Sequence, residues 1–235
     1  MSIGGFITKS KVYPTNSAAV GVYDAREQAR HKRENQWPLY PSTATYQTSA
    51  FNNTALTTYD FTSTSFGDVS STNYLVVIAC ATGTSGTRYP TSVSCGGVSM
   101  TEIVSDQEGS SGVGVWVGNH TATSGTLSVT YATSATDTCG IGVYNVSNTN
   151  GSPIAAAIFN FVASASISSR VGGCVIAGYY QQNSVERAFA DYTADYSVDI
   201  RSGEFMGGAK SNNLTGTSET INLDDNARFL IGVTF

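Results

Sequence analysis

Hydrophobic and polar positions alternate along most of the chain after about residue 58, as expected for β-strands with one buried face. Residues 74–81 form a continuous apolar run, which fits a central strand buried on both faces. Residues 191–201 alternate most sharply, with Asp191, Asp195 and Asp199 on one face and tyrosine, alanine, valine and isoleucine on the other. Residues 229–235 predict a last strand that is tied into a sheet.

About eleven or twelve short strands, separated by turn residues, are expected in this region. In residues 112–118, Val113, Val115 and Val117 are expected on one face, with Trp116 and the glycines on the other. Residues 154–163 fit a helix or a strand by pattern, and their flanking Ser, Thr and Gly favour a strand. The pattern predicts an all-β domain over residues 58–235, a jelly-roll-like antiparallel β-sandwich.

The first forty residues have a different pattern. Residues 1–20 predict an extended arm, because their apolar positions have no period and Gly4, Gly5 and Pro14 disfavour a helix. One short α-helix is expected next: Asp24 is a good N-cap, Glu27 has capping-box spacing, and Pro38 ends the helix. The sequence therefore predicts an anchoring arm and helix over residues 1–40, a linker over 41–57 and the sandwich over 58–235.

Charge separates these two regions. The chain has a net charge of −5, yet residues 1–40 carry six basic and three acidic side chains, so the remaining residues carry −8. The arm is therefore expected to meet an acidic surface, its own body included. Its basic residues are interleaved with acidic ones, so no nucleic-acid partner is expected.

Apolar runs and cysteine spacing indicate the cellular compartment. No run of apolar residues approaches the ~18 that a membrane span needs, and residues 1–20 lack the hydrophobic region of a secretory signal. The four cysteines are widely spaced without a CxxC motif, so we interpret them as small buried apolar residues, with disulfides as the alternative.

Catalytic patterns are few. Neither GxSxG nor HExxH occurs, and the only histidines are His31, in the expected helix, and His120, which we interpret as an exposed loop residue. The aspartates of residues 191–199 lack calcium-loop spacing and are about 13 Å apart at i and i+4 on a strand, which favours a solvated face. The sequence predicts no enzyme, no metal and no cofactor.

Tyrosines offer an alternative function. Tyr89, Tyr179 and Tyr180 lie in or beside strands and turns, where exposed rings would stack on sugars. In a sandwich such rings also fill the core or line subunit contacts. A carbohydrate-binding module that recognises a host surface glycan is therefore the alternative to a purely structural role.

Two groups of residues carry a resemblance. A G-V-Y-x-x-x-E-Q…W-P element resembles one found near one end of many tailed-phage virion proteins; its positions here are Gly21, Val22, Tyr23, Glu27, Gln28, Trp37 and Pro38. Residues 58–235 resemble a β-sandwich domain of phage and environmental bacterial proteins; the matching segments are Leu75–Val77, Gly96–Thr101, Val113–Trp116 and Arg228–Phe235.

The resemblance implies a virion structural protein, made in the host cytoplasm, that acts as a capsid decoration protein or as a tail-attached knob or fibre. Its partners would be major capsid or tail subunits, and it would form a homo-oligomer, with trimers common among phage appendages. The side chains expected to anchor it to a partner are Phe6, Ile7, Tyr13, Tyr23, Arg26, Arg30, Arg33 and Trp37.

Overall fold

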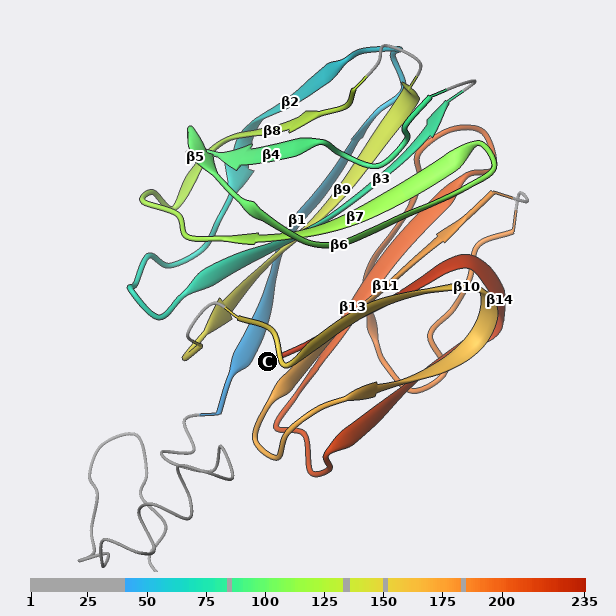
Figure 1. Cartoon of the computed structure of the whole chain (residues 1–235). Helices are drawn as coiled ribbons and strands as arrows, with labels where there is room; N and C mark the ends of the chain where they lie inside the picture. Colours follow the sequence, from blue (N-terminus) through green and yellow to red (C-terminus); the bar gives the residue numbers. More distant parts are fainter. Residues whose placement is uncertain (1–40, 84–85, 133–135, 150–151, 183–184) are drawn as a thin grey trace, which may run out of the picture. The chain divides into compact units, whose positions relative to one another are not determined.

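The computed structural model describes residues 41–83, 86–132, 136–149, 152–182 and 185–235 (Figure 1). This part of the chain is all-β, and every strand pair in it is antiparallel. The arm and the helix expected in residues 1–40 lie outside the described residues. Within the described ranges, no helix is long and apolar enough to cross a membrane.

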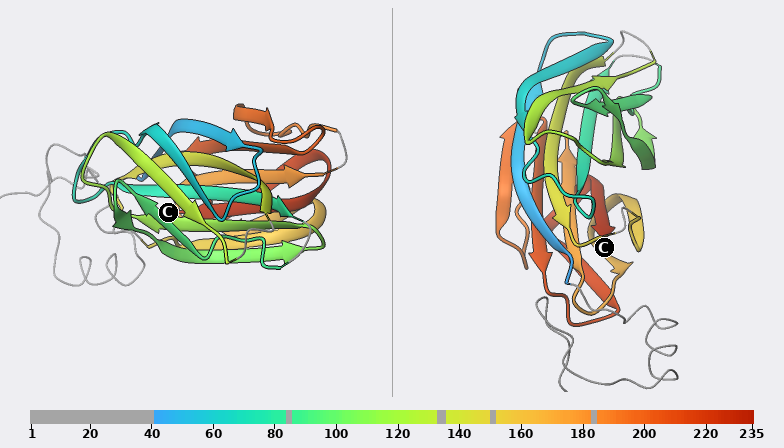
Figure 2. Two further views of the ribbon diagram at one scale, coloured as in Figure 1. Left: turned by 90° about the horizontal axis from the view of Figure 1, so that it is seen from above. Right: turned by 90° about the vertical axis from the view of Figure 1, so that its left-hand side faces the viewer.

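The strands form three sheets. The central sheet has the order β1 (Thr43–Asn52), β9 (Thr136–Ser147), β3 (Tyr74–Gly83), β7 (Ser111–Gly118) and β6 (Thr101–Glu108). A second sheet has the order β10 (Ala155–Ser168), β14 (Ser218–Thr234), β11 (Cys174–Gln181), β13 (Phe205–Asn212) and β12 (Ala194–Asp199). A smaller third sheet has the order β2 (Thr58–Ser65), β8 (Ser124–Thr130), β4 (Ser92–Cys95) and β5 (Val98–Ser99). Figure 2 shows these layers from two further sides.

The central sheet is buried on both faces, and β3 shows how. Val76, Ile78 and Cys80 pack in a core shared with β11, β13 and β14 of the second sheet. Leu75, Val77 and the alanines that follow pack in another core, shared with β2, β4 and β8 of the third sheet. The expectation of a doubly buried strand is therefore confirmed, and so is the split of β7 between Val113, Val115 and Val117 in one core and Trp116 in the other.

The second sheet also has apolar residues on both faces. Val175, Ala177 and Tyr179 of β11 face away from the central sheet and pack in a third core. Its cover comes from the long strands β10 and β14, which pair over most of their length and curl in Figure 1, placing Ile167 and Ile221 in the same core. The ribbon of these two strands thus contributes to the sheet and also covers part of its outer face.

Two expectations about the β-region and the segment before it are not met. The described residues form three sheets where a jelly roll has two, so the jelly-roll topology is not confirmed. Residues 43–52, expected within a linker, form β1, which pairs with β9 from Thr43 to Asn52. Their Thr, Ser and Tyr residues resemble a linker in composition because β1 lies at the sheet edge, where most of its side chains are half-buried. Residues 155–168 form β10, so the expected strand there is confirmed.

The body formed by residues 41–235 has two ends. At the end we call proximal, the Ser42 N–H donates to Gly172 O, and Cys174 exchanges backbone hydrogen bonds with Phe235. β11 runs from there to Gln181 at the distal end, about 25 Å away at ~3.3 Å per residue. The first described residues, from 41 on, therefore lie at the proximal end of the body.

Candidate binding pocket

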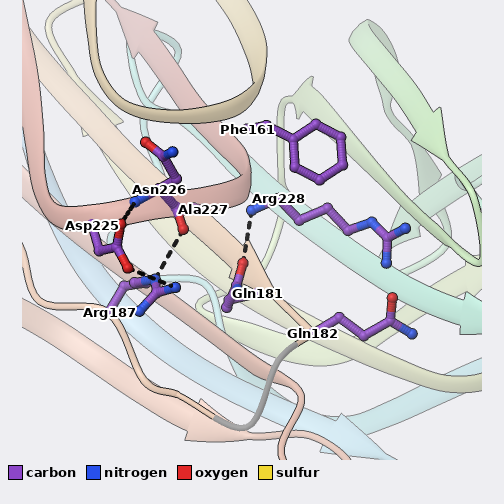
Figure 3. A pocket seen from close by; sticks show the side chains of 8 residues that line it. All are labelled: Phe161, Gln181, Gln182, Arg187, Asp225, Asn226, Ala227 and Arg228. Atoms are coloured by element: carbon purple, nitrogen blue, oxygen red, sulfur yellow. Dashed lines mark hydrogen bonds and ion pairs between the residues drawn. The ribbon is translucent and has the colours of Figure 1, made fainter.

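A pocket of about 340 Å³ lies at the distal end, within the ~300–1,000 Å³ range of small-molecule sites. Its side chains come from β10, the end of β11, the segment after β11, and β14 (Figure 3). They include one aromatic ring, two glutamines and two arginines with a carboxylate, namely Phe161, Gln181, Gln182, Arg187, Arg228 and Asp225. Six of the eight lining residues are polar or charged, and Phe161 provides the main apolar surface.

Arg228 crosses the pocket from β14. Its guanidinium carbon lies 6.0 Å from the centre of the Phe161 ring, within reach of a cation–π interaction. Gly109, at the turn between β6 and β7, makes room for it, because a Cβ atom there would lie 2.6 Å from Arg228 Nη2. The backbone N–H of Arg228 donates to Gln181 Oε1 at 2.9 Å, which ties β14 to the end of β11.

Arg187 is held on the other side of the pocket. Its Nη2 lies 3.4 Å from a carboxylate oxygen of Asp225, and its Nε donates to Asn226 O at 3.0 Å. The Arg187 side chain is only 9% exposed, whereas that of Asp225 is 66% exposed. These contacts fix the guanidinium while leaving its partner carboxylate open to water.

Phe161 has an unusual backbone. Its φ is 55°, in the left-handed region that aromatic residues rarely adopt, and its side chain is 56% exposed. The residues on either side pair with Phe229 and Ala227, which puts Phe161 across from Arg228; the β10–β14 register shifts just beyond, between Val162 and Ser164. The fold thus holds a strained residue with its ring in water, and such strain is often found at functional positions.

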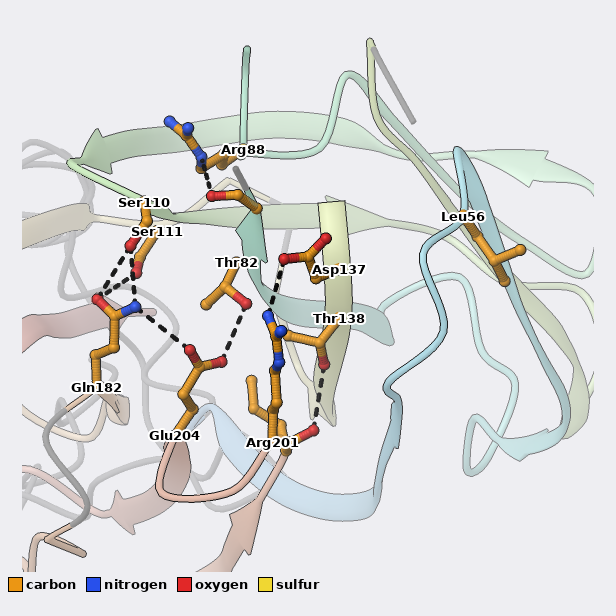
Figure 4. Close-up of polar contacts among 12 residues, drawn as sticks. Leu56, Thr82, Arg88, Ser110, Ser111, Asp137, Thr138, Gln182, Arg201 and Glu204 are labelled. Atoms are coloured by element: carbon orange, nitrogen blue, oxygen red, sulfur yellow. Dashed lines mark hydrogen bonds and ion pairs between the residues drawn. The ribbon is translucent and has the colours of Figure 1, made fainter. Parts of the chain in front are cut away.

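A buried polar cluster adjoins the pocket through Gln182 (Figure 4). Gln182 Nε2 donates to Ser110 Oγ at 2.9 Å and to Glu204 at 3.3 Å, while Thr82 Oγ1 donates to the other Glu204 oxygen at 3.0 Å. The carboxylate of Glu204 therefore bridges the central and second sheets.

Burial has electrostatic consequences in this cluster. Glu204 is only 9% exposed, and this burial raises the pKa of its carboxyl above the usual 4.5 despite hydrogen bonds from Thr82 and Gln182. Arg201, which pairs with Asp137 at 2.9 Å, acts in the opposite direction on the same pKa. The cluster closes the distal end of the core and holds Gln182 at the pocket wall.

The tyrosines expected to face a ligand are placed differently. Tyr179 and Tyr180 are 1% and 0% exposed, so the prediction that these two rings are ligand-facing is wrong. Both faces of β11 are covered: Tyr180 lies in the core against the central sheet, and Tyr179 lies in the core under β10 and β14. Tyr89 is half-buried, and its expected role stays a prediction.

The residues expected to anchor the chain lie outside the described residues, in 1–40. Two other expectations are corrected. His120 is 4% exposed, not a surface loop residue, with Nε2 3.1 Å from both Phe66 O and Asn145 Nδ2; burial lowers its pKa. Asp195 is not solvated either: its side chain is 13% exposed and forms an ion pair with Lys210.

The cysteine interpretation is confirmed, since Cys80, Cys95, Cys139 and Cys174 are all buried and unpaired. Among the residues with described positions, no group of three His, Cys, Asp or Glu side chains is arranged to hold a metal ion.

The pocket was not predicted from the sequence. Its residues come from separate segments, and no motif links Phe161 to Arg228, which are 67 positions apart. One signal existed: only six basic residues occur after residue 40, and Arg187 and Arg228 are two of them.

No family model, curated protein or solved structure matches this chain.

Proposed function

We propose that the chain is a structural protein of a tailed-phage virion, in which residues 1–40 bind a capsid or tail subunit and the β-body projects from the particle. The single observation that supports this most is the two-ended body. Ser42, next to the start of the described residues, lies at the proximal end, whereas the pocket opens at the distal end, about 25 Å away along β11. A module held at one end and open at the other suits display on a particle surface.

Charge supports the same arrangement. Residues 1–40 carry a net charge of +3 and the rest of the chain −8. The basic segment would attract an acidic surface of a neighbouring subunit, while repulsion between the acidic bodies would keep them apart on the particle surface. Attachment would combine aromatic anchors such as Phe6, Tyr13 and Trp37 with many symmetric copies, so that weak single contacts add up. Homo-oligomerisation, including trimers, belongs to this proposal.

The test is removal of residues 1–40. We expect the shortened chain to keep the β-type circular dichroism and cooperative unfolding of the full chain, because all three cores lie in residues 41–235. It should no longer co-sediment with particles that lack the protein, whereas the full chain should. A full chain with Arg26, Arg30 and Arg33 changed to Gln is the matched variant, and it should bind more weakly and with less salt dependence. Unchanged co-sedimentation after the deletion would overturn the proposal.

A second candidate function is recognition of a host surface glycan. The distal pocket favours it, because an exposed ring stands beside arginine and amide side chains at the end of the body away from residue 41. The two functions are compatible in one protein.

A further inference from the structure

Arg228 lacks the kind of partner that the other basic residues of the body have. Six basic residues follow residue 40, and five of them contact an oxygen of the protein: Arg88, Arg170, Arg187, Arg201 and Lys210. No hydrogen bond or ion pair of the Arg228 guanidinium is found within the described part of the chain, and its Nε is buried without a partner. An unpaired buried donor is costly, so an oxygen ligand in the pocket would stabilise it.

The net charge of the side chains that line the pocket favours binding of one negatively charged group. Arg187 and Arg228 against Asp225 give the pocket +1, in a body that carries −8. Arg187 already forms an ion pair with Asp225, so the Arg228 guanidinium is the cationic group that remains available to an anion. Guanidinium groups present paired N–H donors that match the two oxygens of a carboxylate.

The rest of the lining suits a sugar ring. The Phe161 ring is 56% exposed and offers an apolar surface for the C–H face of a pyranose. Gln181 Oε1 is already bonded to the Arg228 N–H, so its amide nitrogen is the end that remains for a hydroxyl; no partner of that nitrogen is found among the described residues. The volume of about 340 Å³ admits a small ligand.

We infer that the distal pocket binds a carboxylate-bearing sugar residue of an acidic polysaccharide. The Arg228 guanidinium takes the carboxylate, Phe161 stacks on the sugar ring, and the Gln181 amide takes a hydroxyl. This inference rests on the second candidate function, glycan recognition at the distal pocket, and names the class of sugar. Its test uses purified protein, so it fails separately from attachment by residues 1–40, and binding of neutral sugars alone would overturn it without overturning glycan recognition.

The experiment is calorimetric titration of the full chain with methyl glycosides of glucuronic acid, galacturonic acid and N-acetylneuraminic acid. Methyl glucoside, sodium acetate and sodium sulfate serve as comparison ligands. We expect at least one acidic glycoside to bind saturably and about tenfold or more tighter than each comparison ligand, since a charge-assisted pair adds ~1.5–3 kcal/mol. The inference is overturned if no acidic glycoside binds better than methyl glucoside, or if acetate or sulfate binds as tightly.

Variants locate the site. Arg228→Gln should weaken binding of the preferred acidic glycoside about tenfold or more, whereas Arg201→Gln, which removes the same charge elsewhere at the distal end, should leave it unchanged. Phe161→Asn should also weaken binding, with Phe51→Asn as the control because Phe51 is exposed on β1. Arg228→Lys, which keeps the charge without the fork, should bind less tightly than the wild type if the carboxylate is held by two bonds. Equal affinities for Arg228→Gln and wild type, with both folded by circular dichroism, would contradict the inference.

Discussion

The side chain of Tyr196 occupies the space that a side chain at Gly142 would need, because a Cβ atom at position 142 would overlap with Tyr196 Oη. Gly142 belongs to β9 of the central sheet and Tyr196 to β12 at the edge of the second sheet, so this contact joins the two layers. Tyr46 of β1 stacks on the same ring, with ring centres 5.5 Å apart. A glycine in one sheet therefore receives an aromatic ring from the other.

Gly142→Ala tests this packing. In a strand without a close neighbour, alanine would be about 0.5–1 kcal/mol more favourable than glycine. Here the methyl group has no room, and overpacking of this kind costs ~1–3 kcal/mol. We expect a lower urea midpoint with an unchanged slope. A midpoint equal to or above that of the wild type would show that the two sheets are packed less tightly than described.

Phe161 should lower stability through its backbone. Asn tolerates the left-handed region better than Ala does, and backbone strain of this kind costs on the order of 1 kcal/mol or more. Since both substitutions remove the ring, their comparison isolates the strain. We expect Phe161→Asn to unfold at a higher urea concentration than Phe161→Ala, by about 1 kcal/mol in free energy. Equal stabilities of the two variants would argue against a φ near 55° at this position.

Glu204 should make stability depend on pH. Burial raises the pKa of its carboxyl in the folded state above the usual 4.5, so the folded chain holds this proton more tightly than the unfolded chain. Its contribution to stability is therefore fully present below pH 4.5 and is lost as pH rises through the raised pKa.

Glu204→Gln removes this titration while keeping a side chain of similar size. The difference in unfolding free energy between variant and wild type should shift in favour of the variant as pH rises from 4 to 7, measured by urea unfolding across that range. Asp60, an exposed carboxylate on β2, provides the control as Asp60→Asn. A difference that stays constant with pH, or shifts the other way, would contradict the raised pKa.

The four thiols should be unreactive in the folded protein. Burial raises the pKa of Cys95, Cys139 and Cys174 to about 12 and that of Cys80 further, so almost no thiolate is present near neutral pH. We expect a disulfide reagent at pH 8 to label none of these cysteines over an hour and all four in guanidinium chloride. Rapid labelling of the native protein would indicate an opening of the cores that the described packing does not provide.

Much of the fold could be predicted because alternation follows burial where a strand has one or two fully covered faces. The doubly apolar run of β3 and the division of β7 between its valines and Trp116 are the clearest cases. β1 was not predicted, because an edge strand with half-buried Thr and Ser side chains resembles a loop in composition. The strand predicted from the alternation of residues 191–201 is confirmed over Ala194–Asp199. The solvated face expected for its aspartates is wrong at Asp195, because Lys210 pairs with it.

The candidate site was less predictable, for a different reason. Whether Tyr179 meets solvent depends on segments distant in sequence, because the Phe189 ring lies 5.6 Å from the Tyr179 ring and β10 and β14 contribute other residues to the same core. No local pattern reports that cover. The pocket depends on the same ribbon, because Phe161 and Arg228 meet across two strands that are distant in sequence. His120 was misjudged in the same way, since Asn145 and Phe66 enclose it from other segments.

Lysine cross-linking of the assembled particle tests the central claim most directly. The chain has four lysines, and Lys9, Lys11 and Lys32 fall within the first forty residues, while Lys210 lies on β13 and serves as the reference. We predict that peptides containing the first three will be found joined to peptides of capsid or tail subunits by mass spectrometry. If those three lysines are joined only to peptides of their own chain, the first forty residues do not attach this protein to the particle and the account is wrong.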